Sequence, residues 1–140
     1  MLMGCRMKAL KGINRKGFTM MELMLVVVIV AILVSIAYPS YIQYVRKSKR
    51  GEAQQLLMNW AINQEIWRSN HTTYAGTGDL AVPTHDDYTF DFAVDPTASV
   101  YTLRATARND QLNDESRDGT GCSPMTMTQS GVKAPPVCWE

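Results

Sequence analysis

Glu22 is the residue whose chemistry is hardest to reconcile with its neighbours in the sequence. It is the sole charged residue in an apolar run of 21 residues, 18–38. About 20 apolar residues in a helix cross the hydrocarbon core of a bilayer, and an acid there normally has both a partner and a function. From the residues alone, two interpretations stay open. Glu22 either meets a counter-charge, or it lies at headgroup depth, where the positive end of the helix favours it.

The three cysteines are placed so that two of them can pair. Cys5 lies among the first 17 residues, whereas Cys122 and Cys138 lie near the other end of the chain. If the first 17 residues are removed, the odd thiol leaves and an even pair remains. A bond between Cys122 and Cys138 would stabilise the fold by about 3 kcal/mol in the chain-entropy model, and it would persist only in an oxidising compartment. The alternative is two reduced, buried thiols.

The other residues that could do chemistry do not form a catalytic or metal-binding pattern. His71 and His85 have no metal-ligand spacing to a cysteine. Residues 114–119 resemble the start of a calcium loop, but Met125 stands where the bidentate glutamate belongs, so hydrogen-bonded turns are expected there. The sequence has neither a nucleophile elbow nor a phosphate-loop lysine motif. We therefore predict no enzyme activity, no catalytic residues, and no cofactor or metal.

Charge is distributed in three regions that indicate different surroundings. Residues 1–17 carry five basic and no acidic side chains, a second basic cluster spans 46–50, and the chain from Gly51 onward has a net charge of −7. An acidic head argues against nucleic acid as its natural ligand, so no nucleic-acid partner is expected. The cluster at 46–50 lies shortly after the apolar run, which favours contact with lipid headgroups or with a protein partner.

Two periodicities predict one long helix and a small sheet. Residues 18–68 read as a single helix, with an apolar first half and an apolar stripe along its second half. Alternation with a two-residue period predicts strands at 88–95 and 101–108, and a short third strand at 125–128. The predicted fold class is α+β: a long N-terminal helix, membrane-spanning in its first half, packed on a small antiparallel sheet of three or four strands.

The junction at the start of the apolar run is the most specific pattern in the chain. Arg15 and Lys16 precede Gly17, the apolar run begins at Phe18, and Glu22 is its fifth residue. This pattern resembles the class III signal of type IV prepilins. The resemblance implies that a prepilin peptidase cleaves between Gly17 and Phe18 and methylates the new amino group of Phe18. It also implies that Glu22 acts in assembly, where its carboxylate meets the amino terminus of a neighbouring subunit.

The same resemblance implies how the chain is organised. Its ending, bounded by Cys122 and Cys138, is similar to the disulfide-bounded C-terminal loop of type IVa pilins. The expected segments are a cleaved basic leader at 1–17, a transmembrane and filament-core helix at 18–38, an amphipathic continuation of that helix at 39–68, and a globular β-sheet head with the C-terminal disulfide loop at 69–140.

The function implied by the resemblance is that of a structural subunit of a type IV pilus. We expect a minor pilin that takes part in pilus assembly or initiation, adhesion and twitching motility. The expected partners are other pilin subunits, prepilin peptidase, the inner-membrane assembly platform and membrane lipid. The expected location is the inner membrane, as a single-pass protein with a periplasmic head, and then the surface pilus.

Three alternatives use some of the same features. One is a pseudopilin of a type II secretion system, which has the same signal and helix. Another is a membrane-anchored binding module that never polymerises; an acid in the span gives such an anchor no advantage. The third is ordinary secretion, because Ser35-Ile36-Ala37 also fits the small-x-small rule for signal-peptide cleavage before Tyr38.

Overall fold

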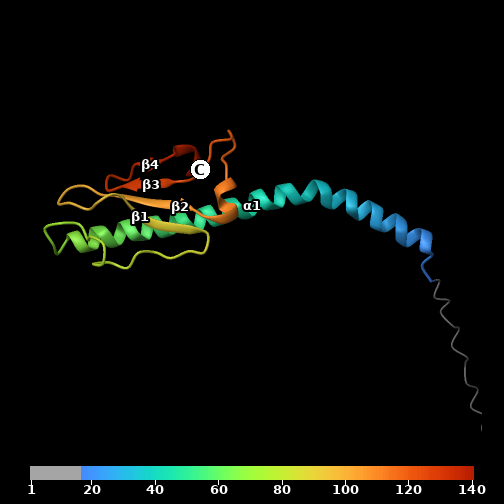
Figure 1. Ribbon diagram of the computed structural model, residues 1–140, viewed down its shortest axis with the longest axis horizontal. Helices are drawn as coiled ribbons and strands as arrows, with labels where there is room; N and C mark the ends of the chain where they lie inside the picture. Colours follow the sequence, from blue (N-terminus) through green and yellow to red (C-terminus); the bar gives the residue numbers. More distant parts are fainter. Residues whose placement is uncertain (1–16) are drawn as a thin grey trace, which may run out of the picture. The chain divides into compact units, whose positions relative to one another are not determined.

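The structure is a computed structural model that describes residues 17–140, so the predicted leader up to Lys16 lies outside the described residues (Figure 1). Contacts divide the chain into two compact units, one ending at Tyr38 and the other comprising Pro39–Glu140. The elements in chain order are α1 (Met20–Arg68), β1 (Tyr88–Val94), β2 (Thr102–Ala107), the 3₁₀ helix η1 (Asn109–Asn113), β3 (Met125–Thr128), β4 (Lys133–Ala134) and the 3₁₀ helix η2 (Pro136–Cys138).

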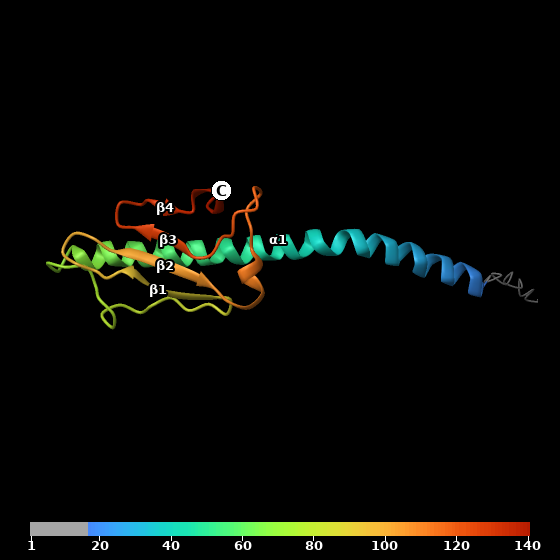
Figure 2. The ribbon, with the colours of Figure 1, turned by 45° about the horizontal axis from the view of Figure 1, so that its top comes forward.

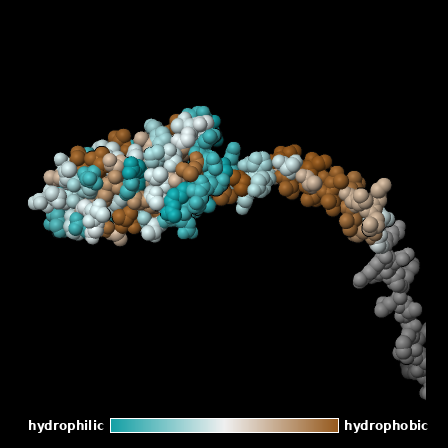
Figure 3. Space-filling model, viewed as in Figure 1, coloured by the Kyte–Doolittle hydropathy of each residue, from teal (hydrophilic) through white to brown (hydrophobic). Residues whose placement is uncertain are grey.

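Helix α1 begins at Met20 because Thr19 caps it. The Thr19 hydroxyl accepts a hydrogen bond from the backbone N–H of Glu22 at 3.2 Å, which satisfies one of the free donors of the first turn. The predicted start at Phe18 is therefore slightly early. Every side chain of the apolar half is exposed, and these side chains form the brown surface in Figure 3. By length and composition alone, α1 is the described helix that could cross a membrane.

The second unit has its core between the distal half of α1 and a sheet (Figure 2). Buried residues on α1 recur at three- and four-residue steps, so they share one face of the helix. Burying one large apolar side chain stabilises a fold by about 1.5–3 kcal/mol. The core consists of Ala53, Leu57, Trp60 and Ala61 from α1, of Tyr88, Phe90, Leu103, Ala105, Ala107 and Met125 from the sheet, and of Tyr101, which directly precedes β2.

The sheet is an antiparallel meander in the order β1-β2-β3-β4. Strand β1 pairs with β2 from Tyr88 opposite Ala107 to Val94 opposite Thr102, with an irregularity between Phe92 and Val94. The alternation in the sequence located β1, β2 and β3 to within a residue or two of their observed bounds. Strand β4 has two residues, too few for any alternating pattern, and it is held by pairing with β3.

Covalent and hydrogen bonds attach the end of the chain to the head. Cys122 and Cys138 form a disulfide bond in the structure, so the alternative of two reduced thiols does not describe it. The side-chain amide of Gln54, on α1, donates a hydrogen bond to the carbonyl oxygen of Cys138 at 2.7 Å. The C-terminal loop is thereby fixed against the helix as well as against itself.

Candidate functional site

Glu22 lies in the first turn of α1, where every neighbouring side chain is exposed and most are apolar. The ion pairs found within residues 17–140 do not include Glu22. Phe18 precedes the helix and is also exposed. A carboxylate in this position has its first-turn backbone donors beside it, and an acid in an apolar span normally pairs with a charge. Within one chain, the described residues provide no such charge.

The basic cluster at 46–50 separates into paired and unpaired side chains. Arg46 donates two hydrogen bonds to the carboxylate of Asp110, from Nε at 3.0 Å and from Nη2 at 2.8 Å. These bonds lower the pKa of the Asp110 carboxyl and raise the pKa of the Arg46 guanidinium. Lys49 pairs with Asp87 at 2.8 Å. Lys47 forms no ion pair with any residue in 17–140.

Arg50 and Asp114 form a buried ion pair that connects α1 to the loop after η1. The Arg50 Nη1 to Asp114 Oδ2 distance is 2.9 Å, and both residues are buried. Burial raises the pKa of the Asp114 carboxyl, and the charge of Arg50 opposes that shift. Asp114 was the first residue of the candidate calcium loop at 114–119. Its carboxylate is committed to Arg50, and Ser116 hydrogen-bonds to Asp118, so this loop is a hydrogen-bonded turn.

Gln64 positions the loop that follows α1. Its fully buried side chain donates to the carbonyl oxygen of Ala75 at 3.0 Å and accepts from the backbone N–H of Ala75 at 2.9 Å. One amide side chain therefore satisfies both backbone groups of Ala75, in the way a neighbouring strand would. This pair of bonds fixes the direction in which the chain leaves α1.

The end of α1 and the loop that follows it place aromatic rings beside a cation. We call this group, which comprises Trp67, Arg68, His71 and Tyr74, the α1 corner. The rings of Trp67 and His71 are stacked, with centroids 3.9 Å apart and planes 4° from parallel. The guanidinium carbon of Arg68 lies 5.9 Å from the centroid of the Tyr74 ring. Arg68 donates from Nε to Ala98 O at 3.1 Å and from Nη1 to His71 O at 2.6 Å. These bonds fix the guanidinium in place.

The comparisons with known proteins concern both halves of the chain. A family described as "Type IV minor pilin ComP, DNA uptake sequence receptor" has a sequence model that matches residues 39–126, from Pro39 through the start of β3. The chain belongs to this family of type IV minor pilins. A second family, the prokaryotic N-terminal methylation motif, matches residues 13–38.

Relatives of the ComP-family chain include other pilins. It is 35% identical over 66 residues to a fimbrial protein of Neisseria meningitidis serogroup A, covering 42% of this chain and 39% of that protein. It is 50% identical over 42 residues to the fimbrial protein EcpC of Eikenella corrodens, covering 30% of this chain and 28% of that protein. The alignments thus span less than half of these curated relatives. A solved type IV pilin from Shewanella oneidensis matches with a TM-score of 0.52 and 26% identity, over 68% of this chain and 98% of that one.

These findings confirm the type IV pilin resemblance and the predicted fold of one long helix packed on a small antiparallel sheet. The family description fits a structural pilin subunit. The methylation motif and the apolar half of α1 fit a pilin that is anchored in the inner membrane and later assembled into a surface pilus. The family description names a DNA receptor, which is at odds with the expectation of no nucleic-acid partner.

Sequence reasoning missed the α1 corner. Trp67 continued the apolar stripe of α1 in the sequence, but in the structure it is half-buried and stacked on His71 rather than part of the core. The signal that could have found this pair is the four-residue spacing of Trp67 and His71. Residues with that spacing adjoin on one helix face, and a chain leaving a helix can keep them together over one further turn.

Proposed function

We propose that this chain is a minor pilin that captures DNA for uptake by a type IV pilus. The observation that carries the proposal is the family match over residues 39–126, which covers the helix and sheet of the head rather than the pilin signal alone. The match also favours a pilus over the secretion-system pseudopilin, because the family is described as type IV pilin. The acidic net charge of the head means that DNA contact depends on a local site rather than on attraction by the whole surface.

The chain reaches the pilus by the steps that the resemblance implies. Prepilin peptidase cleaves after Gly17 and methylates the amino group of Phe18. The α1 helix then holds the protein in the inner membrane with its head in the periplasm, where the Cys122–Cys138 bond is stable. Assembly at the inner-membrane platform pairs Glu22 with the amino terminus of an adjacent pilin. Adhesion and twitching motility stay predictions, since no feature of the head favours either one.

The α1 corner is the part of the head that we assign to DNA contact. Arg68 has two of its donors fixed by backbone carbonyls, and its remaining terminal nitrogen is available for a phosphate oxygen. The stacked Trp67–His71 pair offers an aromatic surface of the kind on which bases or sugar rings pack. The second cation–ring pair of the head, Lys133 over Trp139 at 4.8 Å, lies outside the family match, which makes the corner the better candidate.

DNA binding by the full-length chain in detergent tests the proposal. Fluorescence anisotropy with a short labelled duplex should show binding that weakens as salt is raised. Replacing Arg68 with Ala should weaken it across all duplex sequences and lower the log–log salt slope by about 1, the loss of one phosphate contact.

Arg104→Ala is the matched control, because it removes the same charge from another half-buried arginine, which is paired with Asp91 at 2.6 Å. It should leave the slope unchanged. Absence of binding by the unaltered chain would contradict DNA capture. Equal losses in the Arg68→Ala and Arg104→Ala variants would contradict the assignment to the α1 corner.

A further inference from the structure

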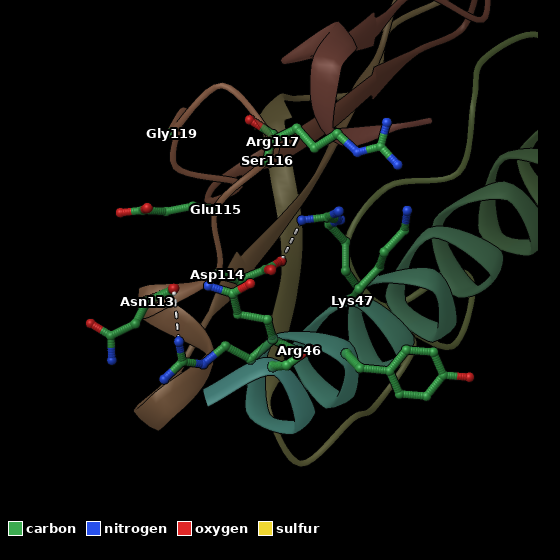
Figure 4. A pocket seen from close by; sticks show the side chains of 12 residues that line it. Arg46, Lys47, Asn113, Asp114, Glu115, Ser116, Arg117 and Gly119 are labelled. Atoms are coloured by element: carbon green, nitrogen blue, oxygen red, sulfur yellow. Dashed lines mark hydrogen bonds and ion pairs between the residues drawn. The ribbon is translucent and has the colours of Figure 1, made fainter. Parts of the chain in front are cut away.

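A cavity lies between α1 and the loop that follows η1, and we call it the basal cavity (Figure 4). Its volume is about 780 Å³, and its walls are the α1 stretch from Ser40 to Arg50 and loop residues between Asn113 and Gly119. A smaller cavity of about 370 Å³ adjoins it, and Lys47 and Arg117 line both. All these residues belong to the second unit, and Figure 4 shows Lys47 and Arg117 entering from the helix and from the loop.

The basal cavity is lined by more basic than acidic side chains, and the smaller adjoining cavity has the carboxylates of Asp118 and Glu140 in its wall. Four basic side chains line the basal cavity against two acidic ones. Arg46 and Arg50 are held by Asp110 and Asp114. Lys47 and Arg117, by contrast, have no carboxylate within 4.0 Å among residues 17–140. These two side chains, one from each wall, are therefore free to bind an anion together.

The position of the cavity along α1 indicates the source of that anion. The helical part of the apolar run, residues 20–38, is about 28 Å long, which is close to a hydrocarbon core of about 30 Å. Lys47 lies nine residues past Tyr38, about 13 Å along the helix axis. Side chains tilt toward the N-terminus of a helix, and a lysine extends its charge toward an interface. The ammonium of Lys47 therefore reaches back to the headgroup layer.

The tyrosines from the end of the span to the wall of the cavity support the same depth. Tyr38, Tyr41 and Tyr44 recur at three-residue steps, and all three are exposed. Tyrosine is enriched where a membrane meets water. Tyr44 also lines the basal cavity, so the interfacial aromatic residues continue directly into its wall.

We propose that the basal cavity binds the phosphate headgroup of an anionic phospholipid while the pilin is held in the inner membrane. The phosphate oxygens accept hydrogen bonds from Lys47 and Arg117, and the acyl chains stay in the bilayer. The inference is independent of DNA capture at the α1 corner. A DNA phosphate has the same chemistry, but this stretch of α1 adjoins the span, where a bilayer surface excludes a duplex.

Lipid selectivity of the full-length chain tests the proposal. Native mass spectrometry of the protein in detergent, titrated with phosphatidylglycerol or phosphatidylcholine, should show preferential retention of phosphatidylglycerol. The double variant Lys47→Gln, Arg117→Gln changes two exposed side chains and should weaken phosphatidylglycerol binding by about tenfold or more, given the usual contribution of basic residues at a membrane surface. The control Lys49→Gln, Arg108→Gln removes two charges from outside the cavity and should retain the selectivity.

Several results would overturn the proposal. One is equal retention of the two lipids by the unaltered chain, and another is an equal loss of selectivity in the control. If the cavity variant keeps its lipid selectivity but loses duplex binding, the site is for DNA. If it keeps lipid selectivity but no longer enters sheared filaments, the occupant is a carboxylate of a neighbouring pilin. If only the DNA-capture proposal is wrong, the chain fails to bind duplex DNA but still prefers phosphatidylglycerol.

Discussion

The charge of Glu22 is the single-residue feature on which we propose that assembly depends. Within residues 17–140 no basic side chain pairs with it, and cleavage after Gly17 would create an ammonium group at Phe18. Two opposite charges about 4 Å apart attract by roughly 4 kcal/mol at an effective dielectric near 20. A contact of this strength between subunits is enough to favour one docking register.

Replacing Glu22 with Ala should separate processing from assembly. We expect the variant to insert in the membrane and to begin at Phe18 by intact-mass analysis, because neither step needs the carboxylate. It should enter sheared filaments poorly, and Glu22→Asp should restore entry only in part, since its shorter side chain misplaces the carboxylate. Incorporation of Glu22→Ala at the unaltered level would show that the acid is a tolerated interfacial residue.

The buried tyrosines make the head less stable as the pH becomes strongly alkaline. Burial raises the pKa of Tyr88 to about 12, and burial also raises the pKa of Tyr101. The folded head keeps the Tyr88 proton where the unfolded chain, with a pKa near 10, loses it. The unfolded state is therefore favoured progressively as pH rises from about 10 to about 12.

We expect the free energy of unfolding to fall with pH across that interval. Denaturant unfolding at a series of pH values would measure the fall, and absorbance of phenolate at 295 nm would report the titration. Tyr88→Phe should flatten the dependence, although it also removes the hydrogen bond from Gln111 to the Tyr88 hydroxyl at 3.0 Å. A phenolate titration in which every tyrosine ionises near pH 10 while the head stays folded would contradict the prediction.

At the scale of elements, the sequence predicted the helix and strands that have a periodic pattern. It did not predict the features that depend on contacts between distant segments. Leu57 and Trp60 recur at helical spacing, and Tyr88 and Phe90 alternate, so the core faces of α1 and β1 were visible. The pairing of Arg46 with Asp110 joins residues 64 positions apart, and no local pattern indicates it. The basal cavity also forms because the loop after η1 lies close to α1. The sequence alone therefore could not predict it.

Gln64 is the side chain whose removal should most destabilise the connection between α1 and the loop that follows it. Gln64→Ala leaves the buried N–H and C=O of Ala75 without partners, and each unsatisfied group costs about 1–3 kcal/mol. We expect a loss of about 2–4 kcal/mol in the free energy of unfolding, measured by urea denaturation. The neighbouring Asn63 is exposed, so Asn63→Ala serves as control and should change stability by less than about 0.5 kcal/mol. Equal effects of the two substitutions would contradict the role of Gln64.

At the scale of the whole molecule, we propose separate tasks for three surfaces. In this proposal the apolar half of α1 serves membrane anchoring and filament packing, the basal cavity serves lipid contact, and the α1 corner serves DNA capture. The chain from Gly51 onward carries a net charge of −7, so few DNA phosphates can be neutralised, and binding should show a shallow dependence on salt. The acidic charge was the reason for expecting no nucleic-acid partner; if the proposed DNA capture is right, this charge limits the affinity for DNA rather than excluding binding at the corner.

DNA uptake by cells that carry single-residue variants tests the central claim most directly. In a strain lacking the native gene, transformation frequency and the amount of this pilin in sheared filaments would be measured together. We predict that the unaltered gene restores both, that Glu22→Ala restores neither, and that Arg68→Ala restores filament incorporation but not transformation. Transformation at the unaltered level by Arg68→Ala would contradict DNA capture at the α1 corner, and transformation unaffected by loss of the gene would contradict a DNA-uptake function altogether.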